Sequence, residues 1–120
     1  MELKGNFYTI QSIERIGAES YRVEVSLLAD HPVYAGHFPG RPVVPGVCTL
    51  TIIRECLREI YGRLVRFTAI QECKYTSMLL PEPGLCVTLM LTVTDSKKLE
   101  GAVIADAGKR QVLKLRATIG

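Results

Sequence analysis

The sequence predicts an α+β fold in which one antiparallel sheet curls around a single long helix. Residues 46–61 carry apolar side chains at steps of three and four, the spacing of a helix with a wide apolar face. The segments before and after them alternate apolar and polar residues, which is typical of half-buried strands. Such a helix must be covered over most of its circumference, and one curled sheet is the simplest cover.

The length and composition predict one globular domain over residues 1–120. The chain has 48% hydrophobic and 22% charged residues, enough apolar content for a core, which excludes intrinsic disorder. Its formal net charge of +3 is smaller than in most nucleic-acid-binding domains, so no nucleic-acid partner is predicted. The sequence has no apolar run long enough to span a bilayer and no secretory signal at its start, so no membrane partner and a cytoplasmic location are expected.

Two strands are expected before the helix and four after it. The predicted strands cover residues 6–15, 21–27, 66–78, 87–93, 99–105 and 113–119. A loop is expected at 29–45, because that segment holds four of the six prolines, and a turn is expected at 106–109.

The helix is expected from Gly46 to Tyr61, with Pro45 and Gly62 as its boundary signals. The predicted apolar stripe consists of Val47, Leu50, Ile53, Leu57, Ile60 and Leu64, widened by Cys48, Ile52 and Cys56. The predicted polar side consists of Thr51, Arg54, Glu55, Arg58 and Glu59.

The four cysteines are expected to act as small hydrophobic residues. They stand at positions 48, 56, 73 and 86, and no pair has the spacing of a zinc or dithiol redox site. The sequence also lacks a nucleotide-binding loop, so neither a metal nor a bound organic cofactor is predicted.

The segment that carries chemistry runs from His31 into the start of the helix. Its prolines stiffen a loop that can hold His37 in one place. The backbone N–H groups of Gly46 and Val47 open the helix without intrahelical partners, so they can bind a carbonyl oxygen that gains negative charge. A fixed imidazole beside such donors suits proton abstraction next to a carbonyl.

The run His37-Phe38-Pro39-Gly40-x-Pro42-Val43-x-Pro45-Gly46-Val47 resembles the signature of the β-hydroxyacyl-acyl-carrier-protein dehydratases. These enzymes belong to the hotdog-fold superfamily. The stretch from Lys74-Tyr75 to Gly84 is similar to the strand and turn that follow the central helix in that family. The resemblance therefore implies a hotdog fold over nearly the whole chain.

In that family the histidine removes the α-proton of a 3-hydroxyacyl thioester, and a glycine at the helix start supplies an oxyanion-hole N–H. A Glu or Asp fourteen residues after the histidine protonates the leaving hydroxyl, and the site lies across a dimer. The resemblance thus implies that His37 is the base and that Gly46 supplies the oxyanion-hole N–H, beside the N–H of Val47 noted above. It also implies a substrate carried on the phosphopantetheine of acyl carrier protein or on coenzyme A, with acyl carrier protein as a partner.

The sequence departs from the family at the acid, because position 51 is a threonine. Glu55 stands one helical turn further on, either as a displaced acid or as a surface charge. Thr51 either holds a water molecule or packs. Alternatively, a partner subunit of a heterodimer supplies the acid. Phe38 either lines an acyl tunnel or fills the core.

Four functions remain open at this point. The first is a dehydratase of fatty-acid, polyketide or polyene synthesis, with His37 as base and Glu55 or Thr51 assisting. The second is the His37-bearing half of a heterodimer. The third is a thioesterase of the same fold, in which a carboxylate activates water. The fourth is a non-catalytic subunit that binds acyl carrier protein.

Overall fold

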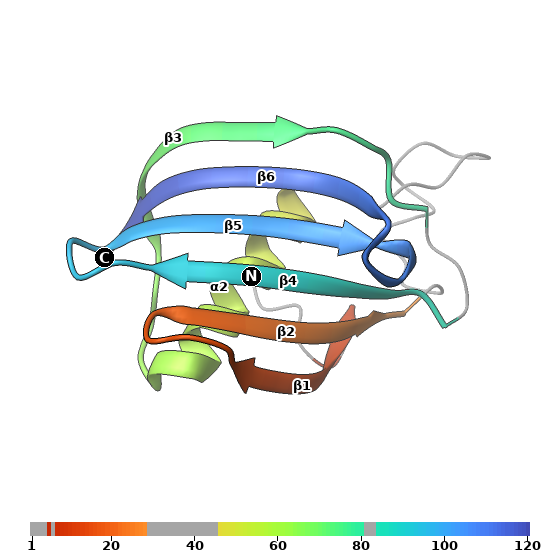
Figure 1. Ribbon diagram of the computed structural model, residues 1–120, viewed down its shortest axis with the longest axis horizontal. Coiled ribbons are helices and arrows are strands. Elements are labelled where there is room, and N and C mark those ends of the chain that lie inside the picture. Colours follow the sequence, from red (N-terminus) through yellow and green to blue (C-terminus); the bar gives the residue numbers. More distant parts are fainter. Residues whose placement is uncertain (1–4, 6, 29–45, 81–83) are drawn as a thin grey trace.

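The computed structural model describes residues 5, 7–28, 46–80 and 84–120. They form a six-stranded antiparallel sheet with one long helix behind it (Figure 1). In chain order the elements are β1 (Tyr8–Arg15), β2 (Ser20–Leu27), α2 (Gly46–Tyr61), β3 (Phe67–Tyr75), β4 (Cys86–Val93), β5 (Lys98–Ala105), the short 3-10 helix η1 (Asp106–Gly108) and β6 (Arg110–Ile119). The predicted architecture is confirmed.

The strand order in the sheet is β1-β2-β4-β5-β6-β3. β1 and β2 form a hairpin before the helix, and β4, β5 and β6 form a meander after it. β3 follows the helix and pairs only with β6, so β1 and β3 are the two edges of the described sheet. The helix therefore connects a strand near one edge to the strand at the other.

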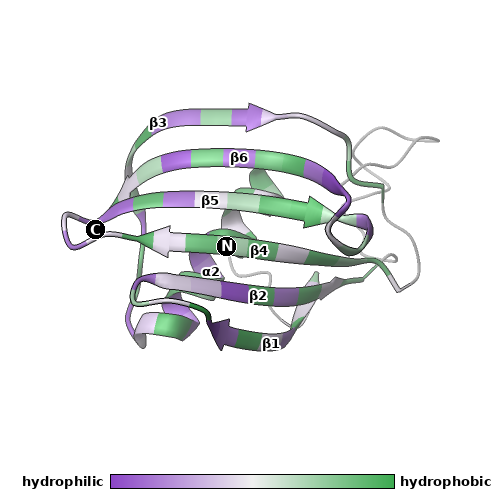
Figure 2. Cartoon of the chain, viewed as in Figure 1, coloured by the Kyte–Doolittle hydropathy of each residue, from purple (hydrophilic) through white to green (hydrophobic). Residues whose placement is uncertain are grey.

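The core lies between the concave face of the sheet and the helix. Alternation along the strands sends one set of side chains inward, and the colours of β6 change along the strand accordingly (Figure 2). The fully buried large side chains on the strands include Val23, Val25, Leu89, Leu91, Leu99, Leu113, Leu115 and Ile119.

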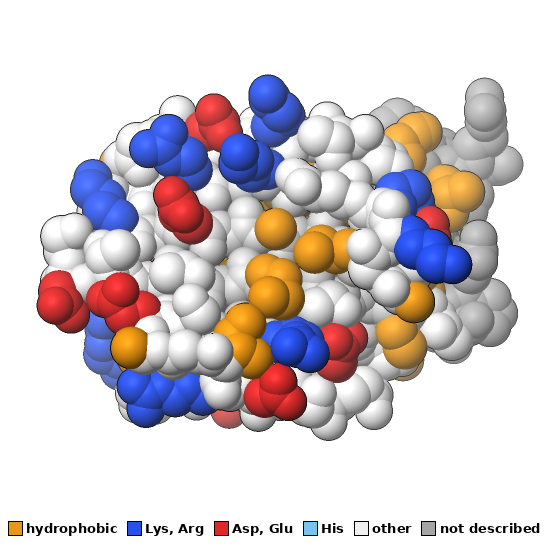
Figure 3. All heavy atoms as spheres, in the orientation of Figure 1, with side chains coloured by type: hydrophobic (Ala, Val, Ile, Leu, Met, Phe, Trp, Pro, Cys, Tyr) orange, Lys and Arg blue, Asp and Glu red, His pale blue; other side chains and the backbone are white. Residues whose placement is uncertain are grey.

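The outer face of the sheet carries charges of both signs rather than one basic patch (Figure 3). Arg116 of β6 stands opposite Glu100 of β5 and Glu72 of β3, so a cross-strand row alternates in sign.

Two strand boundaries differ from the predicted ones by three residues. β3 ends at Tyr75 rather than at residue 78, because the pairing with β6 ends there. β6 begins at Arg110 rather than at residue 113, because Arg110 pairs with Ala105 across a tight turn. The Arg110 guanidinium also donates a 2.8 Å hydrogen bond to Asp106 at that turn.

The predicted faces of the helix are wrong at three positions. Val47 is 63% exposed, because rotation by about 100° per residue turns it away from the sheet-facing Cys48 and Ile52. Leu64 is also exposed, since the helix ends at Tyr61 and Gly62, with φ of 68°, turns the chain. Glu55, predicted to face solvent, is only 4% exposed.

Replacing Ile53 by alanine tests the core, since the Ile53 side chain is fully buried in the middle of α2. The free energy of unfolding is expected to fall by about 2–5 kcal/mol, because the change removes apolar contacts and leaves a cavity. Chemical denaturation followed by circular dichroism measures it. Ile13→Ala on the exposed edge strand is the control, and its loss should stay below about 1 kcal/mol. Equal losses in the two variants would contradict the assigned core.

Candidate active site

The predicted site residues divide into two groups. His37 and Phe38 lie outside the residues that the structure describes. Gly46, Val47, Thr51 and Glu55 all lie on α2, with Gly46 as its first residue. The geometry of the candidate site is therefore built on the first three turns of this helix.

Gly46 lies against the side chain of Tyr75 at the end of β3. A Cβ atom at position 46 would stand 2.6 Å from the Tyr75 hydroxyl oxygen and 2.7 Å from the ring carbon that bears it. Both distances are shorter than van der Waals contact, so only glycine fits while the ring keeps its place. Close contact between the helix start and a phenol is a feature that sequence reasoning missed.

Tyr75 remains a neutral hydrogen-bond donor around neutral pH. Burial raises the pKa of its phenol to about 12, and the neighbouring Cys73 thiol acts in the same direction. A phenol with this pKa keeps its proton at any physiological pH. The start of the helix thus has a polar but uncharged neighbour.

An open hollow of about 240 Å³ adjoins this contact. It is lined by Gly46, Thr49, Tyr75, Ser77, Met78, Leu79 and Val112. Most of the wall is apolar apart from hydroxyl groups. One end of the hollow lies at the start of the helix, where the backbone N–H groups lack intrahelical partners. An apolar chain with a carbonyl at one end matches such a hollow, because the carbonyl oxygen can reach the helix start.

The Thr51 hydroxyl bonds within its own helix. Its Oγ1 donates to the carbonyl oxygen of Val47 at 2.8 Å, and the side chain is half-buried. This i to i−4 bond is the usual way in which threonine satisfies its hydroxyl inside a helix. The Thr51 proton is thus donated within the helix, while its oxygen can still accept a hydrogen bond.

Glu55 is held in the interior by a tyrosine from the sheet. The Tyr8 hydroxyl donates to Glu55 Oε1 at 2.9 Å, and Tyr8 is fully buried at the start of β1. A buried carboxyl costs free energy unless it is hydrogen-bonded, and Tyr8 supplies such a bond. Sequence reasoning missed Tyr8, which begins a strand whose other residues are mostly polar and exposed.

Glu55 lies at the border between the sheet-facing side of α2 and the outer side. It is rotated by about 40° around the helix axis from Thr51, four residues earlier, and Thr51 flanks the exposed Val47 side. Glu55 stands nine positions after Gly46, about 13 Å along the axis at 1.5 Å per residue. The two therefore cannot contact the same short β-hydroxyacyl unit within one chain.

From the raised pKa of the Tyr8 phenol we predict how the free energy of unfolding changes at alkaline pH. Burial raises its pKa well above the usual value of 10.0, and the neighbouring Cys56 and Glu55 raise it further. Above pH 10 the unfolded phenol loses its proton while the folded one keeps it. The folded state then binds more protons, so the free energy of unfolding falls with rising pH by about 1.4 kcal/mol per pH unit from this group.

Tyr8→Phe should remove that contribution and flatten the dependence above pH 10. Denaturant titrations of both proteins between about pH 9 and pH 11 measure it. The same slope in both proteins would contradict the assignment, and below pH 9 the two slopes should coincide.

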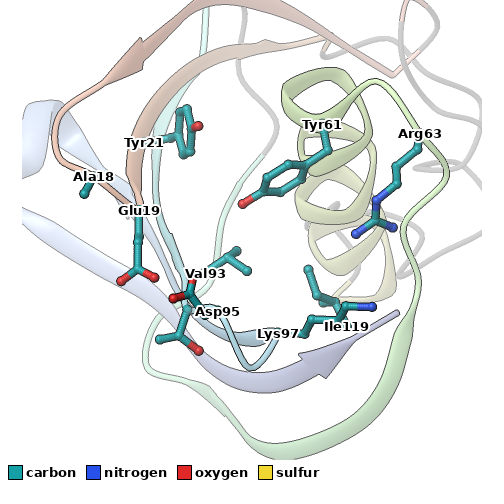
Figure 4. Close-up of a pocket in the computed structure, with 10 residues that line it drawn as sticks. Ala18, Glu19, Tyr21, Tyr61, Arg63, Val93, Asp95, Lys97 and Ile119 are labelled. Atoms are coloured by element: carbon teal, nitrogen blue, oxygen red, sulfur yellow. The ribbon is translucent and has the colours of Figure 1, made fainter.

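A second hollow, of about 270 Å³, lies at the C-terminal end of α2 (Figure 4). Tyr21 and Tyr61 meet there edge to face, with ring centroids 6.5 Å apart, and the Arg63 guanidinium lies 5.9 Å from the Tyr61 centroid. Glu19 and Asp95 add negative charges to the wall, and Lys97 adds a positive one. No predicted site residue lines this hollow.

Comparison with solved structures identifies the fold. A chain of the structure described as the dehydratase heterocomplex ApeI:P from Xenorhabdus doucetiae matches with a TM-score of 0.78, 17% identity, and coverage of 92% of this chain and 95% of that one. The dehydratase domain from the CurF module of curacin polyketide synthase matches with a TM-score of 0.62, 14% identity, and coverage of 91% and 41%. These likenesses confirm the predicted hotdog fold. No helix in the described part of the chain is both long and apolar enough to cross a membrane.

Curated relatives share the sequence more closely. A 3-hydroxyacyl-acyl-carrier-protein dehydratase FabZ from Alkaliphilus metalliredigens is 31% identical over 74 residues, 56% of this chain and 50% of the relative. A FabZ from Herpetosiphon aurantiacus is 30% identical over 94 residues, 66% of this chain and 67% of the relative. The chain spans about half the length of several of the curated relatives that it matches.

The model of one protein family covers most of the chain. Residues 13–112 match the ApeI-like family, described as ApeI dehydratase. This segment includes the helix, the whole of β3 to β5 and the residues around Gly46. The family match agrees with the fold and with the motif at the helix start, and the chain therefore belongs to the ApeI-like dehydratase family.

Proposed function

We propose that the protein dehydrates 3-hydroxyacyl thioesters. His37 removes the α-proton, and the N–H groups of Gly46 and Val47 bind the thioester oxygen as it gains charge. A carboxyl group then protonates the hydroxyl on C3, so that water leaves and an enoyl thioester forms. The observation that carries the proposal is the arrangement on helix α2. The helix begins at Gly46, which has no side chain and lies at an apolar hollow, and it also carries the buried carboxyl of Glu55.

The site is completed by a second chain. Because Glu55 lies about 13 Å along the axis from Gly46, it serves the Gly46 of another copy rather than its own. Leu50 and Thr51 lie midway between Gly46 and Glu55. If the helices of two copies run antiparallel and cross at these residues, Glu55 of one copy lies beside Gly46 of the other. The outer side of the helix start, where Val47 is 63% exposed, supplies apolar surface for such a pairing.

The substrate arrives as a thioester of phosphopantetheine, on acyl carrier protein or coenzyme A. The hollow beside Gly46 suits the apolar acyl chain, while exposed arginines such as Arg58 and Arg63 suit an acidic carrier or its phosphate. The reaction as proposed uses no metal and no bound cofactor. The FabZ relatives, which are named 3-hydroxyacyl-acyl-carrier-protein dehydratases, support a substrate of this class, and fatty-acid, polyketide or polyene synthesis is the setting that we propose.

A two-channel assay tests this function. The purified protein is mixed with a 3-hydroxyacyl N-acetylcysteamine thioester, with ultraviolet absorbance reporting the enoyl thioester and a thiol reagent reporting free thiol. We expect the enoyl band to rise with no release of thiol, because dehydration leaves the thioester intact. Release of thiol without an enoyl band would replace the proposal by thioester hydrolysis.

A second candidate is a subunit that supplies His37 while a related hotdog chain supplies the acid. The structural match to a chain from a dehydratase heterocomplex favours this candidate. Thr51 also favours it, because this residue stands where the family has its acid and its hydroxyl bonds to Val47 instead. This candidate predicts no turnover by the protein alone and turnover after addition of an acid-bearing paralogue from the same genome. Full turnover by the protein alone would exclude it.

A further inference from the structure

We propose that Tyr8 is a positioning residue that holds the acid group of Glu55 for proton donation. This inference rests on the proposed function, in which Glu55 protonates the leaving hydroxyl. Tyr8 lies on β1, far from the motif in sequence, and it is fully buried. Its role is to act through Glu55 rather than on the substrate.

The hydrogen bond from Tyr8 distinguishes the two oxygens of the Glu55 carboxyl. A protonated carboxyl has one O–H donor and one carbonyl oxygen that accepts. Tyr8 donates to Oε1 at 2.9 Å, so in the proposed acid form Oε1 accepts that hydrogen bond and Oε2 carries the proton that is transferred. The hydrogen bond also limits the rotation of the carboxyl about its last bond.

Tyr8 can fill this role because its phenol stays protonated. Burial, together with the nearby Cys56 and Glu55, raises the pKa of the phenol, so the hydroxyl remains a donor throughout the working pH range. Its ring is also fixed, since Tyr8 belongs to the hydrophobic core together with Phe7, Ile53 and Leu57. A donor on a rigid strand is therefore aimed at an acid on a rigid helix.

The comparison of Tyr8→Phe with Tyr21→Phe tests the inference. Both changes remove one phenol oxygen, but Tyr21 lies by the hollow at the far end of the helix, against Tyr61. In the dehydration assay, Tyr8→Phe should lower kcat about tenfold or more and leave KM unchanged, because only the placement of the acid is lost. Tyr21→Phe should leave both constants at their wild-type values.

A double-variant cycle separates positioning from a general loss of structure. In the Glu55→Gln background, adding Tyr8→Phe should lower kcat no further, since the group that Tyr8 positions is already gone. A structural role would instead lower kcat by the same factor in both backgrounds. Denaturant unfolding of each variant, at a concentration matched to the assay, verifies that the molecules assayed are folded.

The outcomes distinguish failure of this inference from failure of the proposed function. If the wild-type protein forms no enoyl thioester, the proposed function fails. If Glu55→Gln keeps full dehydration activity, the proposed dehydration stands, but Glu55 is not the acid and the inference about Tyr8 fails. If Glu55→Gln loses activity while folded Tyr8→Phe keeps the wild-type kcat, only the positioning role of Tyr8 is wrong. A raised KM with unchanged kcat in Tyr8→Phe would likewise overturn positioning, because it would place Tyr8 in substrate binding.

Discussion

Replacing Glu55 by glutamine is expected to lower kcat for dehydration by about 10²–10⁴-fold, the usual contribution of a general acid. Glutamine has nearly the shape of glutamate and keeps an oxygen that can accept the hydrogen bond from Tyr8. It has no acidic proton, so it cannot protonate the leaving hydroxyl near neutral pH. The loss should therefore appear in kcat, measured from the enoyl-thioester absorbance at saturating substrate.

Glu59→Gln is the matched control, because Glu59 lies one turn further along the same helix and is exposed. It changes the net charge by the same amount and should leave kcat unchanged. Thr51→Ala adds a second control: the Thr51 hydroxyl bonds to the Val47 carbonyl, so its loss should change kcat by less than about threefold. Wild-type turnover in Glu55→Gln would remove Glu55 from the mechanism.

The fold was predictable because its elements have strong local periodicity. The helix boundaries at Gly46 and Tyr61 match the predicted ones, since the apolar spacing and the flanking glycine act on neighbouring residues. The β2 alternation from Val23 to Leu27 likewise predicted which side chains are buried. Such patterns require no knowledge of which segments meet.

The site was only partly predictable, because its contacts join distant segments. Local spacing placed Glu55 on the polar side with Arg54 and Arg58. In the structure its carboxyl is buried and accepts a hydrogen bond from Tyr8, which is 47 positions away in the sequence. The contact between Gly46 and Tyr75 is also tertiary, formed only when β3 closes the sheet beside the helix start. Patterns within a segment cannot show a hydrogen bond or a close approach between segments.

Replacing His37 by alanine is expected to lower kcat by a similar factor, about 10²–10⁴-fold, because no other group in the motif can take the α-proton. The chain has only two histidines, so His31→Ala is the matched control and should keep wild-type kcat. Loss of activity in both variants would point to the loop as a whole rather than to the His37 imidazole. Unchanged activity in His37→Ala would remove the proposed base.

Mixing His37→Ala with Glu55→Gln extends this prediction to the architecture of the site. If two copies complete each site, a mixed dimer holds one site with neither residue and one site with both. After unfolding and refolding together in equal amounts, the mixture should recover about a quarter of the wild-type activity, since half of the dimers are mixed and each has one intact site of two. A site contained in one chain would give no recovery.

A chain that takes its acid from a different hotdog subunit would give no recovery either. In that case the Glu55→Gln variant would match the wild type in the presence of that subunit. The pair of measurements therefore decides between a homodimer that uses Glu55 and a heterodimer that does not.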